Sequence, residues 1–259
     1  SVLAGSGDAM QRDYWYSVAR DANQLESAKL VGEKAAQRTI ARLDARSLST
    51  RQCPVLFSAE TASGLIGALM GAISGGSLYR KATFLLDSLD TQILPDFVRL
   101  HEQPLLKGAL GSASYDAEGV ATKARDIVSN GVLRSYLLSS YSARKLGMKT
   151  TGNAGGVHNL IVEPGEQDFA GMLKLLDTGL LVTELMGQGV NRVTGDYSRG
   201  ASGFWVENGV IQYPVQEITI AGNLKSMLRN LVAIGNDVDV RGNIRVGSIL
   251  LEQMAIAGE

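Results

Sequence analysis

Residues 54–76 have the sequence PVLFSAETASGLIGALMGAISGG, and this stretch decides the fold. Its apolar start, residues 55–57, suits a buried strand, and the spacing then changes to the 3.6-residue period of a helix. The apolar positions of this predicted helix are Leu65, Ile66, Leu69 and Met70. Ser58 or Thr61 can cap its start, and Gly75-Gly76 is expected to end it.

The opposite face of the predicted helix carries small residues, which are Gly64, Gly67, Ala68, Gly71 and Ala72. A glycine inside a helix costs roughly 1 kcal/mol relative to alanine. Several glycines together therefore predict that another element approaches the helix backbone closely.

The same stretch resembles a segment of the TldD/PmbA (TldE) family in which the TldD branch carries the zinc motif His-Glu-x-x-x-His. In this alignment the first histidine falls on Ser58, the glutamate on Ala59 and the second histidine on Ser63. Zinc hydrolysis by this motif needs the histidine pair and the glutamate base, and this chain has none of the three. Glu60 is one position out of register and is expected to face elsewhere on the helix. The chain therefore resembles the PmbA/TldE branch, which lacks the ligands.

A third ligand position lies near the end of the chain. The resemblance implies that the TldD branch binds zinc there through a cysteine, and the matching residue in this chain is Arg241. Arginine stays protonated and cannot bind a metal. We therefore expect no catalytic residue and no metal ligand in this chain, with zinc held instead by a sister subunit of the TldD type.

The composition is that of an ordinary globular protein. The chain has 259 residues, of which 45% are hydrophobic and 20% charged, and its formal net charge is −1. No basic cluster offers the positive surface that direct nucleic-acid binding requires. We therefore expect no nucleic-acid partner, although members of the TldD/PmbA family, which this chain resembles, have carried the label modulator of DNA gyrase.

The cysteine count and the hydropathy bear on location. Cys53 is the only cysteine, so no intrachain disulfide can form, which fits a reducing cytoplasm. Cys53 precedes Pro54 and is expected to be a packed residue rather than a reactive one. The chain contains no apolar run of 18 residues, so we expect no membrane partner.

Local patterns predict the elements along the chain. Asn130-Gly131 and Asn208-Gly209 each favour a tight hairpin, because Asn-Gly supplies the two positive-φ residues of a type I′ turn. Helices are expected at 24–43, 140–146, 168–177 and 224–231, and strands at 13–18, 159–162, 179–187, 238–240 and 245–256. The segment 159–187 suggests a strand–helix–strand crossover.

These patterns predict an α+β fold, with predominantly antiparallel β-sheet and hairpins and a few packing helices. Residues 1–50 are expected to be a connecting strand and helix that continue a missing N-terminal α/β domain. Residues 51–259 are expected to be the β-rich C-terminal domain of the resembling family.

Two glycine-rich loops are candidates for a substrate or partner cleft. The first, residues 150–159, matches no phosphate-binding pattern, and two interpretations stay open: a peptide-binding cleft or a tight turn. The second, residues 193–201, resembles a signature of the PmbA branch. Its Ser198 has no base nearby in sequence and is not expected to be a nucleophile. The cleft candidates are Thr151, Gly152, Asn153, Gly155, Gly156, Asp196, Tyr197, Ser198 and Arg199.

Two histidines and a glutamate are further candidates for a functional site. His101 and His158 are the only histidines, and two histidines form at most half a metal site. Glu184 lies among apolar neighbours and is a candidate functional carboxylate, although a charge on the solvent side of an edge strand is the favoured interpretation.

The resemblance implies a cytoplasmic TldD/TldE assembly that cleaves unfolded peptides, including bacteriocin precursors and antitoxins. In it this chain would shape the cleft for extended peptide substrates beside a TldD-type catalytic subunit. Two alternatives stay open. The chain could be a peptidase in its own right, with a metal site built from His101, His158 and acidic groups. It could also be a non-proteolytic peptide-binding module that forms a homodimer when alone.

Overall fold

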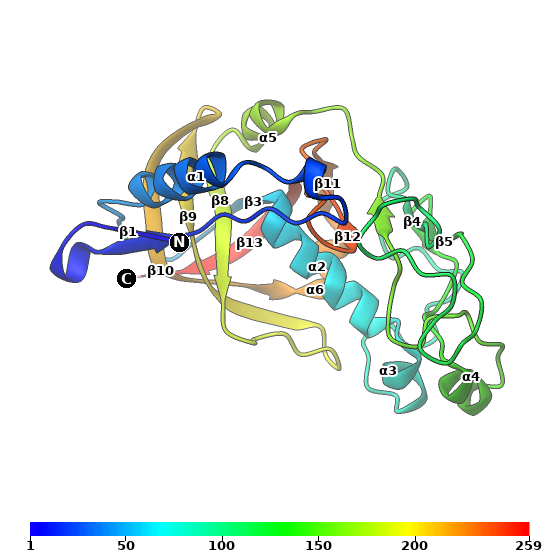
Figure 1. Ribbon diagram of the computed structural model, residues 1–259. Coiled ribbons are helices and arrows are strands. Elements are labelled where there is room, and N and C mark those ends of the chain that lie inside the picture. Colours follow the sequence, from blue (N-terminus) through cyan, green and yellow to red (C-terminus); the bar gives the residue numbers. More distant parts are fainter. Residues whose placement is uncertain (259) are drawn as a thin grey trace.

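The larger sheet of the protein closes on itself. The structure is a computed structural model that describes residues 1–258 (Figure 1). Six strands are ordered β10-β9-β8-β3-β13-β11, and β10 also pairs with β13, so five of them form a closed, barrel-like ring. The strands are β3 (Arg51–Phe57), β8 (Gly179–Met186), β9 (Asp196–Glu207), β10 (Val210–Asn223), β11 (Leu231–Ile234) and β13 (Ile249–Ala257).

A smaller sheet lies beside the barrel, with the strand order β12-β7-β4-β5-β6. Its strands are β4 (Leu100–Glu102), β5 (Arg125–Ser129), β6 (Val132–Leu133), β7 (Leu160–Val162) and β12 (Ile244–Arg245). All strand pairs between named strands are antiparallel except β3–β8 and β7–β12. The predicted class, α+β with predominantly antiparallel sheets, is therefore confirmed.

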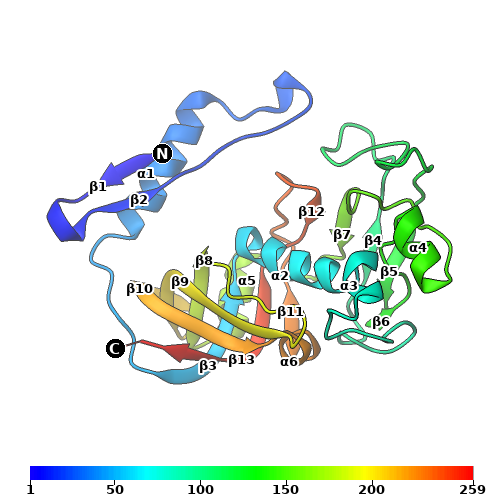
Figure 2. The ribbon, with the colours of Figure 1, turned by 90° about the horizontal axis from the view of Figure 1, so that it is seen from below.

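Helices connect and cover these sheets. α2 (Ala59–Ala72) and α3 (Gly75–Tyr79) run from the barrel toward the smaller sheet (Figure 2). The others are α1 (Ala28–Ala41), α4 (Ser140–Leu146), α5 (Phe169–Leu176) and α6 (Leu224–Arg229). Two short 3-10 helices occur at Gly7–Ala9 and Ala22–Gln24.

The N-terminal segment forms a separate layer. β1 (Val2–Ala4) and β2 (Gln11–Asp13) make a two-stranded sheet that packs on α1. Figure 2 shows this layer standing off from the barrel, with an extended strap that leads from β2 to α1. The strand predicted over 13–18 is wrong, because only Asp13 belongs to a strand and residues 14–18 are extended without a sheet partner.

The two Asn-Gly turns and one short helix are confirmed. Asn130, Gly131, Asn208 and Gly209 all have φ between 50° and 74°, and they form the tight turns of the β5–β6 and β9–β10 hairpins. α4 spans the predicted residues and ends at Gly147, which adopts the left-handed conformation. The predicted crossover is wrong, because β7 belongs to the smaller sheet and β8 to the larger one.

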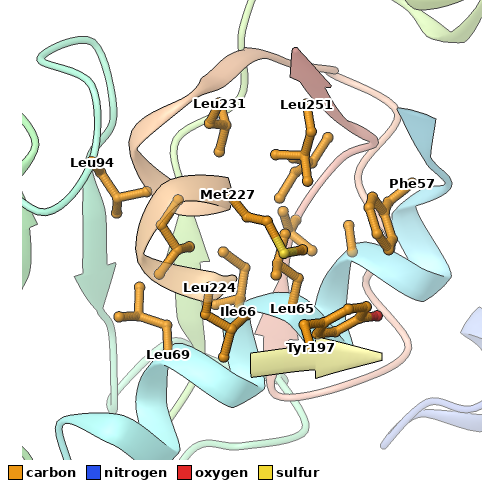
Figure 3. Packing of buried hydrophobic residues seen from close by; sticks show 14 of the residues in the cluster. Phe57, Leu65, Ile66, Leu69, Leu94, Tyr197, Leu224, Met227, Leu231 and Leu251 are labelled. Carbon is orange, nitrogen blue, oxygen red and sulfur yellow. The ribbon is translucent and has the colours of Figure 1, made fainter. Parts of the chain in front are cut away.

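Burial of one face of α2 forms the centre of the core. The predicted apolar positions Leu65, Ile66, Leu69 and Met70 are all buried. Figure 3 shows side chains of this face packed toward Leu224 and Met227 of α6 and the neighbouring strands. Cys53 of β3 is also buried, which raises the pKa of its thiol to about 11.

The small face of α2 differs from the expectation. Within residues 1–258, a Cβ at Gly64 would meet nothing within 4 Å, and at Gly67 it would meet only the tip of Ile244, so no other backbone lies close to these two glycines. Gly71 faces the side chain of Arg192. α2 also ends at Ala72, before Gly75-Gly76, because Ser74 caps a new helix, α3, that begins at Gly75. The glycine face of α2 is therefore largely open.

Candidate functional site

Ser58, Ala59 and Ser63 lie at the N-terminus of α2, directly after β3. Ser58 is the N-cap residue, and its Oγ lies 3.1 Å from Thr61 Oγ1. Ser63 Oγ donates a hydrogen bond of 2.7 Å to the carbonyl of Glu60. Both hydroxyl groups are thus engaged within the first turn of the helix.

Arg241 reaches this turn from the other end of the sequence. Its guanidinium donates to both carboxylate oxygens of Asp239 at 2.9 Å and also to Glu60. Partial burial lowers the pKa of Arg241, but the bonds to Asp239 and Glu60 offset this and raise its net pKa. Burial raises the pKa of Asp239, and Arg241 lowers it further than burial raises it. A permanent cation therefore sits between two carboxylates at the first turn of α2.

Two aromatic rings of the N-terminal strap complete the contacts of this guanidinium. Arg241 Cζ lies 3.9 Å from the ring centroid of Trp15 and 4.7 Å from that of Tyr16. Trp15 Nε1 donates to Glu26, and Lys34 and Arg38 also lie over the Trp15 ring. Cation–π contact of this kind favours a fixed arrangement of cation and ring.

The ion pairs continue from Glu60 into α1 and the barrel. Arg38 bonds both oxygens of Glu60, at 3.2 and 3.0 Å, and lies 3.3 Å from Asp13. Arg42 pairs with Asp13 at 3.5 Å and also with Glu184. Glu184 is therefore a structural partner, and it does not lie on an edge strand, because β8 runs between β9 and β3.

This network borders a cavity of about 280 Å³ at the start of α2, which we call the α2 cavity. Its charged lining residues are Asp13, Arg38, Arg42, Glu60, Glu184 and Arg199. Glu60, one position out of register with the motif glutamate, thus has a structural role at this site. Glu60 binds the residue, Arg241, that stands at the third ligand position.

The donor set here does not fit a zinc ion. Zinc sites use histidine, cysteine and carboxylate ligands, whereas the four aligned positions offer two serines, an alanine and a guanidinium, and the nearby carboxylates of Glu60 and Asp239 are bonded to that guanidinium. Within residues 1–258, no group of three or more His, Cys, Asp and Glu side chains is placed to hold a metal.

The two histidines have separate partners. His101 Nδ1 lies 3.2 Å from Gln103 Nε2, and His101 Nε2 lies 3.5 Å from Glu163. His158 Nδ1 lies 3.2 Å from Glu102. Each histidine therefore lies beside one carboxylate, which gives no support to a shared metal site.

The first glycine-rich loop is held by a buried carboxylate. Glu102 is fully buried, and its Oε1 accepts hydrogen bonds from Asn153 Nδ2 at 2.8 Å and from the His158 amide at 2.7 Å. Thr151 Oγ1 donates to Asn153 Oδ1 at 2.8 Å. Gly152 has a φ of +70°, which glycine adopts easily. These contacts fix the shape of the loop.

The far side of this loop borders an open hollow of about 440 Å³, which we call the glycine groove. Gly67, Gly71, Gly75 and Gly76 of α2 and α3 line one wall. Asn153, Gly155 and Gly156 line the facing wall, and Asn243 and Ile244 belong to the same lining. Three of the five cleft candidates in this loop therefore face a common groove.

The second glycine-rich loop is divided between three environments. Asp196 and Ser198 line a hollow of about 670 Å³ together with Arg80 and Arg192. We call this hollow the arginine cavity. Arg199 lines the α2 cavity. Tyr197 packs in the core with 3% exposure, and this burial raises the pKa of its hydroxyl. Tyr197 is therefore a core residue and does not line the cleft.

Sequence reasoning missed the residues that contact Arg241 and Asn153. Asp239 is two residues from Arg241, and that spacing was the one local signal available. Trp15, Arg38 and Glu102 are brought in from distant segments, and no local pattern marks them.

One further property of the chain concerns membranes. None of the helices described within residues 1–258 is both long enough and apolar enough to cross a lipid bilayer.

Comparisons with known proteins agree with the resemblance. Residues 50–258 match the model of the PmbA/TldA metallopeptidase C-terminal domain. The chain is 57% identical over 258 residues to Metalloprotease PmbA of Escherichia coli O157:H7, and it spans 57% of the length of that protein.

Solved structures share the fold. A Bacteroides thetaiotaomicron structure named for modulation of DNA gyrase matches with a TM-score of 0.93 and 32% identity, over 99% of this chain and 58% of that one. TldE from Thermococcus kodakarensis matches with a TM-score of 0.85 over 99% of this chain and 61% of that one, and at 23% identity this likeness concerns the fold alone. The chain therefore belongs to the PmbA/TldA metallopeptidase family, and the match to the family's C-terminal domain covers residues 50–258.

Proposed function

We propose that this chain is the non-catalytic, PmbA/TldE-type subunit of a zinc metallopeptidase complex. One observation carries the proposal: the guanidinium of Arg241, paired with Glu60 and Asp239, lies at the first turn of α2. A second cation beside it would be repelled, and the ligand types that zinc prefers are absent from these positions. In this proposal the metal site belongs to a sister subunit of the TldD type.

The proposed substrates are unfolded or extended peptides, including bacteriocin precursors and antitoxins. The glycine groove supports this substrate class, because glycine walls leave room for a chain to approach the backbone closely. Extended peptides bind through hydrogen bonds to exposed backbone groups, and in this groove the loop residues Gly155 and Gly156, rather than the helices, would offer them. The chain would then shape the cleft and limit access to flexible segments, in a cytoplasmic assembly.

The test is hydrolysis of an unstructured peptide by the complete protein, alone and mixed with a His-Glu-x-x-x-His sister protein, with and without a chelator. We expect activity only in the mixture, and we expect the chelator to abolish it. Chelator-sensitive hydrolysis by the purified protein alone would contradict the proposal and would favour a peptidase with its own metal site.

A matched variant sharpens this test. Asp239→Asn in this chain removes one negative charge beside Arg241 without adding a metal ligand, so activity of the mixture should persist. Peptide binding without turnover in every mixture would instead favour a non-proteolytic module, and size measurements on the protein alone would then show whether it is a homodimer.

A further inference from the structure

Two arginines, Arg80 and Arg192, share the arginine cavity. Arg80 is the C-cap residue of α3, and Arg192 lies in the loop before β9. Both line this cavity of about 670 Å³. Among the side chains described within residues 1–258, no Asp or Glu forms a salt bridge with either guanidinium. The hydrogen bond that Arg80 makes with a side chain goes to the hydroxyl of its neighbour Tyr79.

The carboxylate in the same lining is already engaged. Asp196 accepts from Thr194 Oγ1 at 2.6 Å and from Asn223 Nδ2 at 3.3 Å, and these bonds hold its pKa below the ordinary value. The cavity therefore contains two guanidinium groups and one carboxylate whose oxygens bond elsewhere. Its remaining lining is uncharged and mixes polar side chains (Ser77, Gln188, Asn191 and Ser198) with Ala82, Gly189 and Val190.

Gly71 and Gly76, which line the glycine groove, lie directly beside the two arginines. The position of a Cβ on Gly71 would lie 3.3 to 3.4 Å from Arg192, and that of a Cβ on Gly76 would lie 3.3 Å from Arg80 Nη2. Gly71 and Gly76 themselves line the glycine groove. The arginine cavity and the glycine groove therefore meet at these two contacts, with a positive charge on each.

We propose that Arg80 and Arg192 form a binding site for a carboxylate of an extended peptide that lies along the glycine groove. The guanidinium fork matches the two oxygens of a carboxylate, which explains why arginine suits this position better than lysine. The carboxylate would come either from the C-terminus of the peptide or from an Asp or Glu side chain. This inference rests on the proposed peptide substrate, but it does not depend on where the metal lies.

The test is direct binding, measured by fluorescence anisotropy on the complete protein without a sister subunit. The probes are labelled unstructured peptides of one sequence in three forms: a free C-terminal carboxylate, a C-terminal amide, and the amide with an internal Gln replaced by Glu. Exposed ion pairs contribute modestly, so we expect Arg80→Gln or Arg192→Gln to weaken binding of a carboxylate peptide about two- to fivefold, and the pair to weaken it about tenfold.

The amide peptide should bind more weakly and should be insensitive to these variants. Preference for the free C-terminus or for the internal Glu identifies the source of the carboxylate. Arg12→Gln is the matched control, because it removes an exposed arginine of β2 in the separate N-terminal layer. Both target arginines are exposed, so the variants are expected to fold.

Two results would overturn the inference. One is equal affinity for the acid, amide and Glu peptides. The other is a loss of affinity in Arg12→Gln as large as that in Arg80→Gln, which would indicate unspecific attraction to positive charge. Either result, together with chelator-sensitive hydrolysis only in the mixed complex, would reject this site and leave the proposed function intact.

Discussion

At the scale of single residues, Arg241 does more than an ordinary surface ion pair. Its side chain is only 12% exposed, and it joins Asp239, Glu60 on α2 and the rings of Trp15 and Tyr16. An exposed ion pair contributes about 0–1 kcal/mol, whereas removal of one partner from a buried pair leaves a charge without compensation. The position that resembles a metal-ligand position thus holds a structural cross-link.

Replacement of Arg241 by alanine is expected to lower the free energy of unfolding by about 1–3 kcal/mol, because Glu60 and Asp239 lose a shared partner. Arg241→Lys keeps the charge but loses the fork and the stacking on Trp15, so an intermediate loss is expected. Urea denaturation followed by circular dichroism measures both. Wild-type stability in the alanine variant would show that the cross-link is dispensable.

The acid response of stability is expected to depend on Asp239. Its pKa in the folded protein is lowered, with burial opposing and Arg241 causing the shift. Such a group stabilises the fold fully above its unfolded pKa of about 4, and this stabilisation is lost as the pH falls through the lower folded value. The stability gap between wild type and Asp239→Asn should therefore shrink as the pH is lowered from about 6 to 3. A gap that stays constant over this range would argue against the shift.

At the scale of elements, Gly64 of α2 and Gly75 of α3 lie in opposite environments, one open and one crowded. Gly64 lies in the middle of a helix, and a Cβ added to it would meet nothing within 4 Å. Packing therefore does not require a glycine at this position. At Gly75 an added Cβ would clash with Ser142 Oγ and would lie 2.5 Å from Ser142 Cβ, because α4 packs directly on α3. Substitution by alanine should therefore have opposite signs at the two sites.

Gly64→Ala is expected to raise the free energy of unfolding by up to about 1 kcal/mol, through helix propensity alone. Gly75→Ala is expected to lower it by about 1–3 kcal/mol, since Ser142 would have to move. Urea midpoints of the two variants give the comparison under one set of conditions. Equal effects of the same sign would show that the α3–α4 contact is looser than these distances imply.

The origin of these elements explains which of them the sequence could predict. The Asn-Gly turns and the helix that ends at Gly147 depend on neighbouring residues, so local patterns sufficed. The fate of Glu60 depended on Arg241, which lies 181 positions away, and the closure of the barrel depended on the pairing of Ile220 with Ile256. The spacing of apolar residues along the sequence does not reveal contacts between such distant segments. The cleft candidates were split for the same reason: alternation along β9 places Tyr197 in the core and Ser198 outside.

At the scale of the whole molecule, the N-terminal layer is joined to the barrel mainly by polar contacts. α1 packs on β1 and β2, and its side chains reach the barrel and α2 through the ion pairs of Arg38 with Glu60 and of Arg42 with Glu184. The strap adds the stacking of Trp15 on Arg241. Segments held by few apolar contacts open more readily than a core does. The layer is therefore expected to open before the barrel unfolds.

Trp15→Ala is expected to speed amide hydrogen exchange in α1 roughly tenfold, since it removes a ring shared by Arg241, Lys34 and Arg38. Exchange in α2 should stay unchanged because its apolar face remains buried in the core. Tyr14→Ala is the matched control, since Tyr14 lies on the same strap and is largely exposed. If exchange rises equally in α1 and α2, the N-terminal layer and the barrel open together, and the ion pairs between them contribute as much to cooperativity as the core does.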